Sequence, residues 1–207
     1  MLNGLTIESQ TAINGLIAKN IVATPIQKEN IVKNSSGSVL SKNTQRTNFK
    51  IWPNSGIVLP EIIQTAKDVN LLEDRIQYHD YYANGNLKEV SLKNGAHIIY
   101  LWGYNQTQPI AKIENATSTQ ISAALGVSDV SDLNESNLSS INALRNNISF
   151  TNSMITTYTY VPLVGVSSIT DPRGDTITYT YDSFGRLQFV KDKDGNILSE
   201  NQYNYKQ

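Results

Sequence analysis

The chain has 207 residues, of which 39% are hydrophobic, and a formal net charge of -1. This length suits one domain or two, and the charge predicts no nucleic-acid partner and no binding to an anionic membrane surface. Cysteine is absent, which excludes disulfides, thiol nucleophiles and zinc–thiolate sites. No apolar run approaches the roughly 20 residues of a membrane helix, so no membrane span is predicted. The first residues have neither a basic start nor an apolar core, so we expect no signal peptide in this chain.

Residues 1–75 are predicted to form an N-terminal segment of mixed strands and a short helix, which packs on the sheet formed by the rest of the chain. Apolar positions at helical spacing favour a short helix over 7–19. Turn residues 34–37 between two apolar runs indicate a hairpin, and 48–52 is typical of a strand. Pro60 is expected to limit the next strand to an edge or a loop. The composition of 61–73 allows either a helix or an extended segment.

From residue 76 onward the chain repeats one hairpin pattern, which predicts a mainly β fold. Thr and Tyr alternate before residue 181, a turn centred on Gly185 follows, and a second strand begins at Leu187. A Tyr, an apolar residue six positions later and another three positions after that recur four times. The four sets are Tyr81, Leu87 and Val90; Tyr104, Ile110 and Ile113; Tyr160, Val166 and Ile169; and Tyr181, Leu187 and Val190.

The spacing of these tyrosines indicates a repeat array with one insertion. Successive frame tyrosines lie 23 residues apart (81 to 104) and 21 apart (160 to 181), but 56 apart between 104 and 160. The insertion, about 117–153, has two apolar stripes of helical period. Thr119 and Ser136 are candidate helix caps, and Gly126 is a candidate helix stop. We expect two short helices that cover part of the sheet.

The turn at the last hairpin resembles a known family. Tyr181-Asp182-Ser-Phe-Gly185-Arg186-Leu187 is similar to the YD repeat of Rhs-type proteins, and the flanking runs 169–174 and 194–196 fit the same pattern. The unit at Tyr81 keeps Gly85 but has Tyr82 and Asn86 where the motif has Asp and Arg. The chain therefore resembles the C-terminal region of Rhs/YD-repeat proteins of Bacteroidetes type. The resemblance implies stacked antiparallel β-hairpins over 76–207.

The resemblance also implies a function and partners. YD repeats build large β shells, some of which enclose a toxin or display a surface module. On this basis the chain is a non-catalytic shell segment of a longer secreted or surface-exposed protein, located outside the cell or in the envelope. Its partners would be neighbouring YD repeats. The alternating tyrosines near the C-terminus further predict self-association through 199–207.

Candidate chemistry in the sequence is sparse. His79 and His97 have no Cys or acidic pair at ligand spacing, so we expect exposed structural positions, no metal and no catalytic residue. Asp171-Pro172 invites either backbone cleavage or a turn, and Asp182 with Arg186 either a ligand contact or a turn brace. A carbohydrate-binding module is the alternative function, with a possible ligand face at Tyr158, Tyr160, Tyr179 and Tyr181. No cofactor is predicted.

Overall fold

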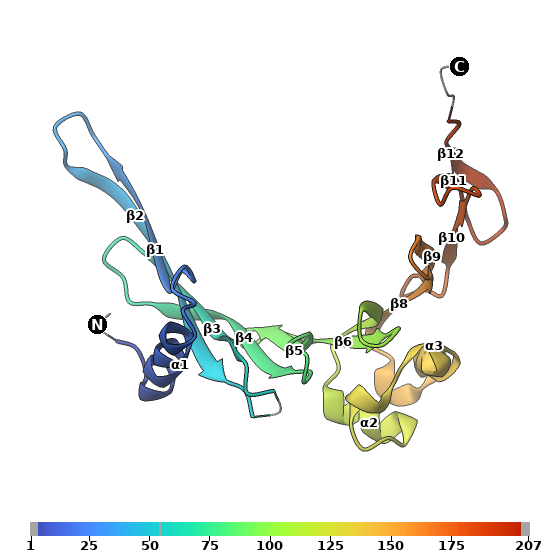
Figure 1. The fold of residues 1–207 in the computed structure, drawn as a ribbon, viewed down its shortest axis with the longest axis horizontal. Helices are drawn as coiled ribbons and strands as arrows, with labels where there is room; N and C mark the ends of the chain where they lie inside the picture. Colours follow the sequence, from blue (N-terminus) through green and yellow to red (C-terminus); the bar gives the residue numbers. More distant parts are fainter. Residues whose placement is uncertain (1–3, 54, 204–207) are drawn as a thin grey trace. The chain divides into compact units, whose positions relative to one another are not determined.

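The computed structural model describes residues 4–53 and 55–203, and it divides the chain into two compact units, 1–97 and 98–207. Each unit is built mainly from antiparallel strands that pair with their neighbours in sequence, which confirms the mainly β prediction (Figure 1). The predicted boundary at residue 75 falls inside the fourth strand. Because that strand pairs with the strands on both sides of it, residues 73–81 belong to the N-terminal unit.

The first unit is a meander of five strands with one helix. Residues 34–37 form a hairpin turn, as expected. The segment 61–73 is not helical: it is a strand as far as Lys67 and then turns at residues 68–70. The elements are α1 (Ile7–Ala18), β1 (Gln27–Lys33), β2 (Val39–Ile51), β3 (Val58–Lys67), β4 (Glu73–Tyr81) and β5 (Leu87–Leu92).

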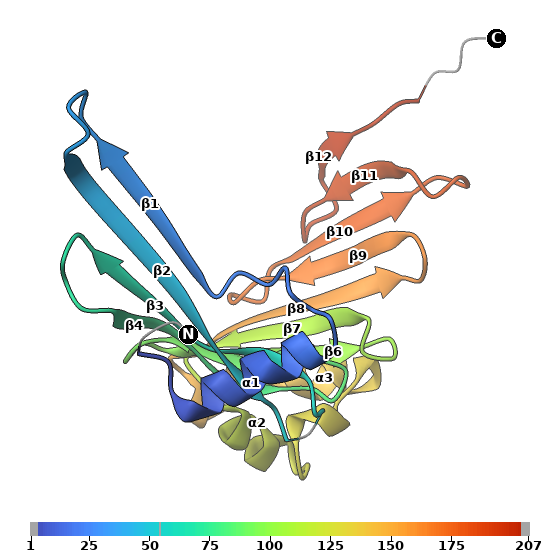
Figure 2. The same ribbon diagram turned by 60° about the vertical axis from the view of Figure 1, so that its left-hand side comes forward.

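Helix α1 lies against β2 and β3, as the two ribbon views show (Figures 1 and 2). Thr6 caps it by accepting a hydrogen bond from the Ser9 backbone N–H. Ala12 and Ile13 pack on Phe49, and this contact buries the apolar side of the helix. The ladder between β2 and β3 has a bulge at Phe49, and the Phe49 N–H donates to Ser9 Oγ at 3.1 Å. The helix thus satisfies a backbone group near the bulge.

Pro60 does not confine β3 to an edge, contrary to expectation. β3 lies between β2 and β4, and Pro60 pairs with Phe49 at the bulge of the β2–β3 ladder. The ladder between β3 and β4 spans only residues 62–65 of β3, so it does not require an N–H from Pro60. A bulge and a short neighbouring ladder allow this proline within an inner strand.

The second unit is also a meander of antiparallel strands, and it includes the insertion. Its strands are β6 (His97–Gly103), β7 (Gln108–Glu114), β8 (Met154–Val161), β9 (Gly165–Thr170), β10 (Thr176–Tyr181), β11 (Leu187–Lys191) and β12 (Ile197–Glu200). Helices α2 (Ser118–Leu125) and α3 (Leu138–Ala143) lie in the insertion between β7 and β8, as predicted, together with four 3-10 turns at Val130–Asp132, Glu135–Asn137, Leu144–Asn146 and Ile148–Phe150.

The helix caps of the insertion differ from those predicted. Thr117, not Thr119, caps α2, because its hydroxyl and the Gln120 side chain form a reciprocal capping box. Gly126 ends this helix with φ at 68°, as expected. α3 begins after Asn137, which makes no side-chain cap, because residues 135–137 form a separate 3-10 turn.

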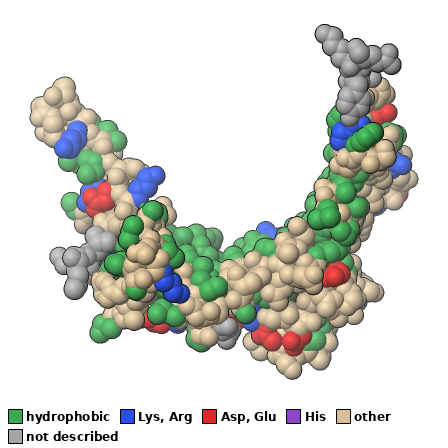
Figure 3. All heavy atoms as spheres, in the orientation of Figure 1, with side chains coloured by type: hydrophobic (Ala, Val, Ile, Leu, Met, Phe, Trp, Pro, Cys, Tyr) green, Lys and Arg blue, Asp and Glu red, His purple; other side chains and the backbone are tan. Residues whose placement is uncertain are grey.

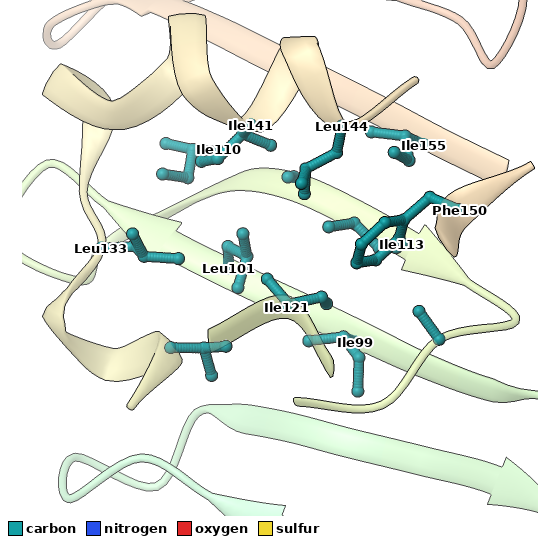
Figure 4. Packing of buried hydrophobic residues seen from close by; sticks show 13 residues of the cluster. Ile99, Leu101, Ile110, Ile113, Ile121, Leu133, Ile141, Leu144, Phe150 and Ile155 are labelled. Carbon is teal, nitrogen blue, oxygen red and sulfur yellow. The ribbon is translucent and has the colours of Figure 1, made fainter. Parts of the chain in front are cut away.

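The insertion closes over β6 and β7 to form the main apolar core (Figure 4). The strands contribute Ile99, Leu101, Ile110 and Ile113, none of which is exposed. The insertion contributes six buried side chains that face them: Ile121, Val130, Leu133, Ile141, Leu144 and Phe150. Ile148 continues the helical spacing of Leu138, Ile141 and Leu144 in the sequence, but it is 88% exposed because a 3-10 turn interrupts the helix. A single-layered sheet buries little apolar surface by itself, so the insertion, which acts as a lid on β6 and β7, supplies most of the unit's apolar burial.

Candidate functional site: the repeated tyrosine hairpins

Five hairpin turns share one backbone geometry. In each turn, the backbone N–H of the first residue donates a hydrogen bond to the carbonyl of the fifth. A glycine at the fourth position has φ between 75° and 90°. Only glycine adopts this conformation without strain, which explains its position in the motif. The turns are 34–38, 82–86, 171–175, 182–186 and 192–196.

The first residue of four of these turns is Asp or Asn, and its side chain braces the turn. In the turn at Asp182, Oδ1 accepts the backbone N–H groups of Phe184 at 2.9 Å and of Arg186 at 3.0 Å. Asp171 accepts two turn amides in the same way. Tyr82 replaces Asp in the turn 82–86, where Asn84 accepts the Asn86 N–H. Asp171-Pro172 therefore begins a braced turn.

Arg186 adds an ion pair to the turn at Asp182. Its Nη2 lies 2.5 Å and its Nε 2.8 Å from Asp182 Oδ2. These contacts, together with the backbone amides, hold the pKa of the Asp182 carboxyl below its usual value. The guanidinium also lies over the Tyr203 ring, 4.3 Å from its centroid. Asp182 and Arg186 thus connect the turn to the chain after β12.

The spacing of six and then three residues is explained by strand pairing. Tyr181 pairs with Leu187 across β10 and β11, and Tyr179 with Val190. Because a bulge adds one residue, the second apolar position falls three residues after the first instead of two. The same pairing occurs between Tyr160 and Val166, Tyr158 and Ile169, Tyr81 and Leu87, and Tyr78 and Val90.

The hydroxyl of each regular frame tyrosine reaches the preceding hairpin. Tyr181 Oη donates to the Val166 carbonyl at 2.7 Å, and Tyr160 Oη donates to the Pro109 carbonyl at 2.9 Å. Tyr81 donates to the Pro60 carbonyl at 3.0 Å. Tyr203 makes the same bond to Leu187 at 2.9 Å, although the sequence frame did not include it. A distance of 22 residues from Tyr181 is the signal that could have identified Tyr203.

Tyr104 departs from the frame. It lies in the loop after β6 instead of at the end of a strand, with φ at 51°. Its hydroxyl accepts the Tyr160 backbone N–H at 3.1 Å, and the two rings meet edge to face at 5.4 Å. Ile110 and Ile113 of this unit are fully buried, whereas the apolar residues of the other frames are half-buried. The insertion packs on Ile110 and Ile113, which accounts for their deeper burial.

The possible ligand face consists of half-buried rings. Tyr158 and Tyr160 lie on β8, and Tyr179 and Tyr181 lie on β10. Burial raises the pKa of Tyr158 and Tyr160. The hydroxyls of Tyr160 and Tyr181 are bonded to backbone carbonyls. The face is therefore partly covered and partly used for contacts between hairpins.

The sequence suggested that the two histidines lie at exposed positions, but in the structure they are half-buried and in contact with each other. Their rings stack with centroids 4.5 Å apart. His79 Nε2 lies 2.9 Å from Ser91 Oγ, and His97 Nδ1 lies 2.5 Å from Glu89 Oε1. The pKa of His79 is lowered mainly by burial and to a smaller extent by the neighbouring His97. The β4–β5 ladder skips His79 at a bulge, and the sequence pattern gave no sign of that bulge.

Within residues 4–53 and 55–203, no three His, Asp or Glu side chains come together in a way that could hold a metal ion. The described helices also include none that is long and apolar enough to cross a membrane.

Comparison with known families identifies part of the array. Residues 165–197 match the model of the RHS repeat, which confirms the resemblance to Rhs/YD-repeat proteins for β9 to β11 and the start of β12. The restriction to a Bacteroidetes type stays a prediction. No curated protein matches the chain.

Several solved structures of a toxin complex are similar to this chain at low identity. A crystal structure of TcdB2-TccC3 without its hypervariable C-terminal region has 11% identity and a TM-score of 0.45, over 83% of this chain and 9% of the other. TcdB2-TccC3-Cdc42 has 9% identity and a TM-score of 0.45, over 91% and 10%. The Photorhabdus luminescens Tc holotoxin pore with TccC3-D651A has 10% identity and a TM-score of 0.44, over 91% and 10%. The chain thus spans about a tenth of the length of these structures.

Proposed function

We propose that this chain is a non-catalytic structural segment of an RHS-type β array within a larger protein. The observation that supports this most strongly is the tyrosine bond between hairpins. Tyr81, Tyr160, Tyr181 and Tyr203 each join one hairpin, or the chain after β12, to the second strand of the hairpin before it. Such a contact between neighbours is what a repeat array needs, because each repeat is stabilised mainly by the adjacent ones.

The proposal includes a location and a setting taken from the family resemblance. We infer that the parent protein is secreted or surface-exposed and serves as a toxin-delivery or cell-surface scaffold. Its immediate partners would be neighbouring repeats of the same chain. The polar groups of the Asp182 turn are bonded to one another and to the turn backbone, which favours a structural role over a catalytic one.

Carbohydrate binding by the tyrosine face is not favoured. A sugar platform needs exposed rings with hydroxyls that contact the ligand or water. Tyr160 and Tyr181 are half-buried and donate their hydroxyl protons to backbone carbonyls. These contacts hold the hairpins together.

A duplication experiment tests the structural role. A second copy of residues 182–203 inserted directly after Tyr203 would continue the 22-residue spacing from Tyr181 to Tyr203. If the chain is an array segment, the new hairpin should pair with β12 and slow hydrogen exchange at the β12 amides. Exchange is measured by mass spectrometry or NMR at matched pH.

The control inserts the same 22 residues in scrambled order. This control should leave exchange of β12 unchanged, because it lacks the turn and the pairing pattern. Equal exchange rates in the duplicated and scrambled proteins would contradict the array function.

A further inference from the structure

A groove of about 830 Å³ lies in the second unit, between the loop that joins β6 to β7 and the loop that joins β8 to β9. One loop lines it with Tyr104, Asn105, Thr107 and Gln108, and the other with residues 161–166; Tyr160 and Glu135 complete the lining. In the space-filling view, apolar side chains gather over β8 and β9 (Figure 3). A volume of this size lies in the range of small-molecule sites.

Both loops hold bulky residues in strained backbone conformations. Tyr104, Asn105 and Gln106 have φ values of 51°, 57° and 59°, a run of three left-handed residues. Across the groove, Leu163 has φ at 63° and a fully exposed side chain. An exposed leucine gains nothing from burial, and its backbone would be less strained with glycine or asparagine there. Strain of this kind with no packing benefit points to a role outside folding.

The carboxylate of Glu135, which lines the groove, is held in place by the backbone. A side chain at Gly103 would meet Glu135 Oε2 at 2.7 Å, so the glycine permits this close approach. Glu135 Oε2 accepts the Tyr104 backbone N–H at 2.6 Å. This bond lowers the pKa of Glu135, which keeps the side chain ionised at neutral pH. Of the described residues that line the groove, Glu135 alone carries a charge.

The rest of the groove combines aromatic and apolar surface. Tyr104 and Tyr160, which also line the groove, meet edge to face at 5.4 Å. Val161 and Val164 are about two-fifths exposed on the opposite loop, next to Leu163. Aromatic faces attract cations, and apolar side chains prefer similar neighbours. The groove therefore complements a positive charge flanked by apolar groups.

We propose that this groove binds an extended peptide segment in which a lysine or arginine is flanked by apolar side chains. The cation pairs with Glu135 and lies beside the rings of Tyr104 and Tyr160. The apolar side chains of the peptide cover Leu163 and Val164. This binding role does not depend on the array function, because it uses the loops at the hairpin ends and not the strand edges.

The test uses the full chain and three short probes. The first probe is acetyl-Leu-Arg-Leu-amide, the second replaces Arg with Gln, and the third is maltotriose. Titration of 15N-labelled protein with the Arg peptide should give saturable shifts at the amides of 104–107, 161 and 163–166. The Gln peptide should bind about fivefold more weakly, as expected for the loss of one exposed charge pair.

Two variants separate binding from folding. Glu135→Gln keeps an oxygen that can accept the Tyr104 N–H but removes the charge, and it should weaken the Arg peptide about fivefold. Leu163→Gly removes the apolar side chain and relieves the backbone, so it should weaken binding about tenfold while raising the melting temperature. Glu200→Gln, a carboxylate on β12, is the matched control and should change neither property.

Several results would overturn the proposal. These are the absence of saturable shifts with the Arg peptide, equal binding of the Gln peptide, and shifts located away from both loops. Unchanged binding in Glu135→Gln or Leu163→Gly would do the same. Shifts with maltotriose and none with the peptides would identify a sugar groove instead.

Discussion

Asp182 shows how one side chain can define a repeat turn. Its two oxygens serve different groups: Oδ1 accepts two backbone amides, and Oδ2 accepts the Arg186 guanidinium. Asp192 repeats the arrangement with Asn196 in place of the arginine. In these two turns the acceptor is at the first position, whereas the partner at the fifth position can be charged or neutral.

Replacement of Asp182 separates these two contacts. Asp182→Ala should speed hydrogen exchange at the Phe184 and Arg186 amides, because it removes their acceptor. Asp182→Asn should retain most of the protection, since the amide oxygen can still accept both bonds. NMR exchange rates distinguish the two, and equal rates in both variants would contradict the brace.

The turn at Asp182 should also weaken in acid. The pKa of this carboxyl is lower in the folded protein than in the unfolded chain. Its stabilising contribution is therefore complete above the unfolded pKa of about 3.9 and is lost as the pH falls through the folded value. Amide exchange in the hairpin, measured from pH 6 to pH 2.5, should report this loss. The acid sensitivity of this turn should be smaller in Asp182→Asn.

Tyr181 and Gly165 form a second pair at the residue scale. A methyl group at position 165 would lie 2.6 Å from Tyr181 Oη, too close for the ring to keep its bond to Val166. Tyr181→Phe should cost about 1 kcal/mol of unfolding free energy through the lost hydrogen bond. Gly165→Ala should lower the unfolding free energy more in the native protein than in the Tyr181→Phe variant, because that variant lacks the hydroxyl that the new methyl group would meet. Denaturant unfolding of the double-mutant cycle measures this coupling, and additive costs would contradict the proposed contact.

At the scale of elements, the insertion is attached to the sheet by Arg145. Its guanidinium donates to the carbonyls of Ile155 at 2.8 Å, Thr170 at 3.3 Å and Asp171 at 3.3 Å. Asn142 also contacts this guanidinium and accepts the Thr157 hydroxyl at 2.8 Å. A single cation therefore joins the lid to β8 and to the turn after β9.

Arg145→Met should loosen the lid, because it retains the apolar stem but leaves these carbonyls without a donor. The guanidinium is partly exposed, so the expected cost is modest, about 1–2 kcal/mol of unfolding free energy. Urea unfolding followed by tryptophan fluorescence and by circular dichroism measures it. Arg173→Met is the control, since Arg173 is exposed in the neighbouring turn. An equal effect of both variants would contradict the attachment.

The elements of the insertion also show the limit of prediction from sequence. The six-then-three frame gave the strands at Tyr81, Tyr160 and Tyr181, because side-chain alternation follows directly from strand geometry. It failed at Tyr104, where the chain forms a left-handed loop. The stack of His79 on His97 depends on a bulge in the β4–β5 ladder. The position of Glu135 depends on its contact with Tyr104, which lies 31 residues away in sequence. Local patterns contain no information about such contacts.

At the scale of the whole molecule, the array ends at β12 within the described residues. All four residues of β12 are exposed, and its recorded pairing is with β11. Tyr203 lies in the described part, whereas Tyr205 and residues 204–207 of the predicted association segment lie outside it. An exposed strand edge is a template for pairing with another chain.

Shortening the chain after Leu198 should reduce self-association. The change removes the whole segment 199–207, including Tyr203, but it leaves the hairpin of β10 and β11 complete. Sedimentation of both proteins at equal concentration, with circular dichroism as a check on folding, measures the effect. If both proteins sediment as the same monomer, association through this segment is wrong.

The tyrosine bonds between hairpins also predict how the chain responds to force. Each hydroxyl bonds backward, to the hairpin that precedes its own, so pulling from the C-terminal end would first break the bond from Tyr203 to Leu187 and next the bond from Tyr181 to Val166. Each rupture would release one repeat of about 22 residues, or about 75 Å of extended chain. A force–extension trace should therefore show evenly spaced peaks over the last hairpins. The spacing should become irregular on reaching the insertion, which Arg145 ties to several strands at once.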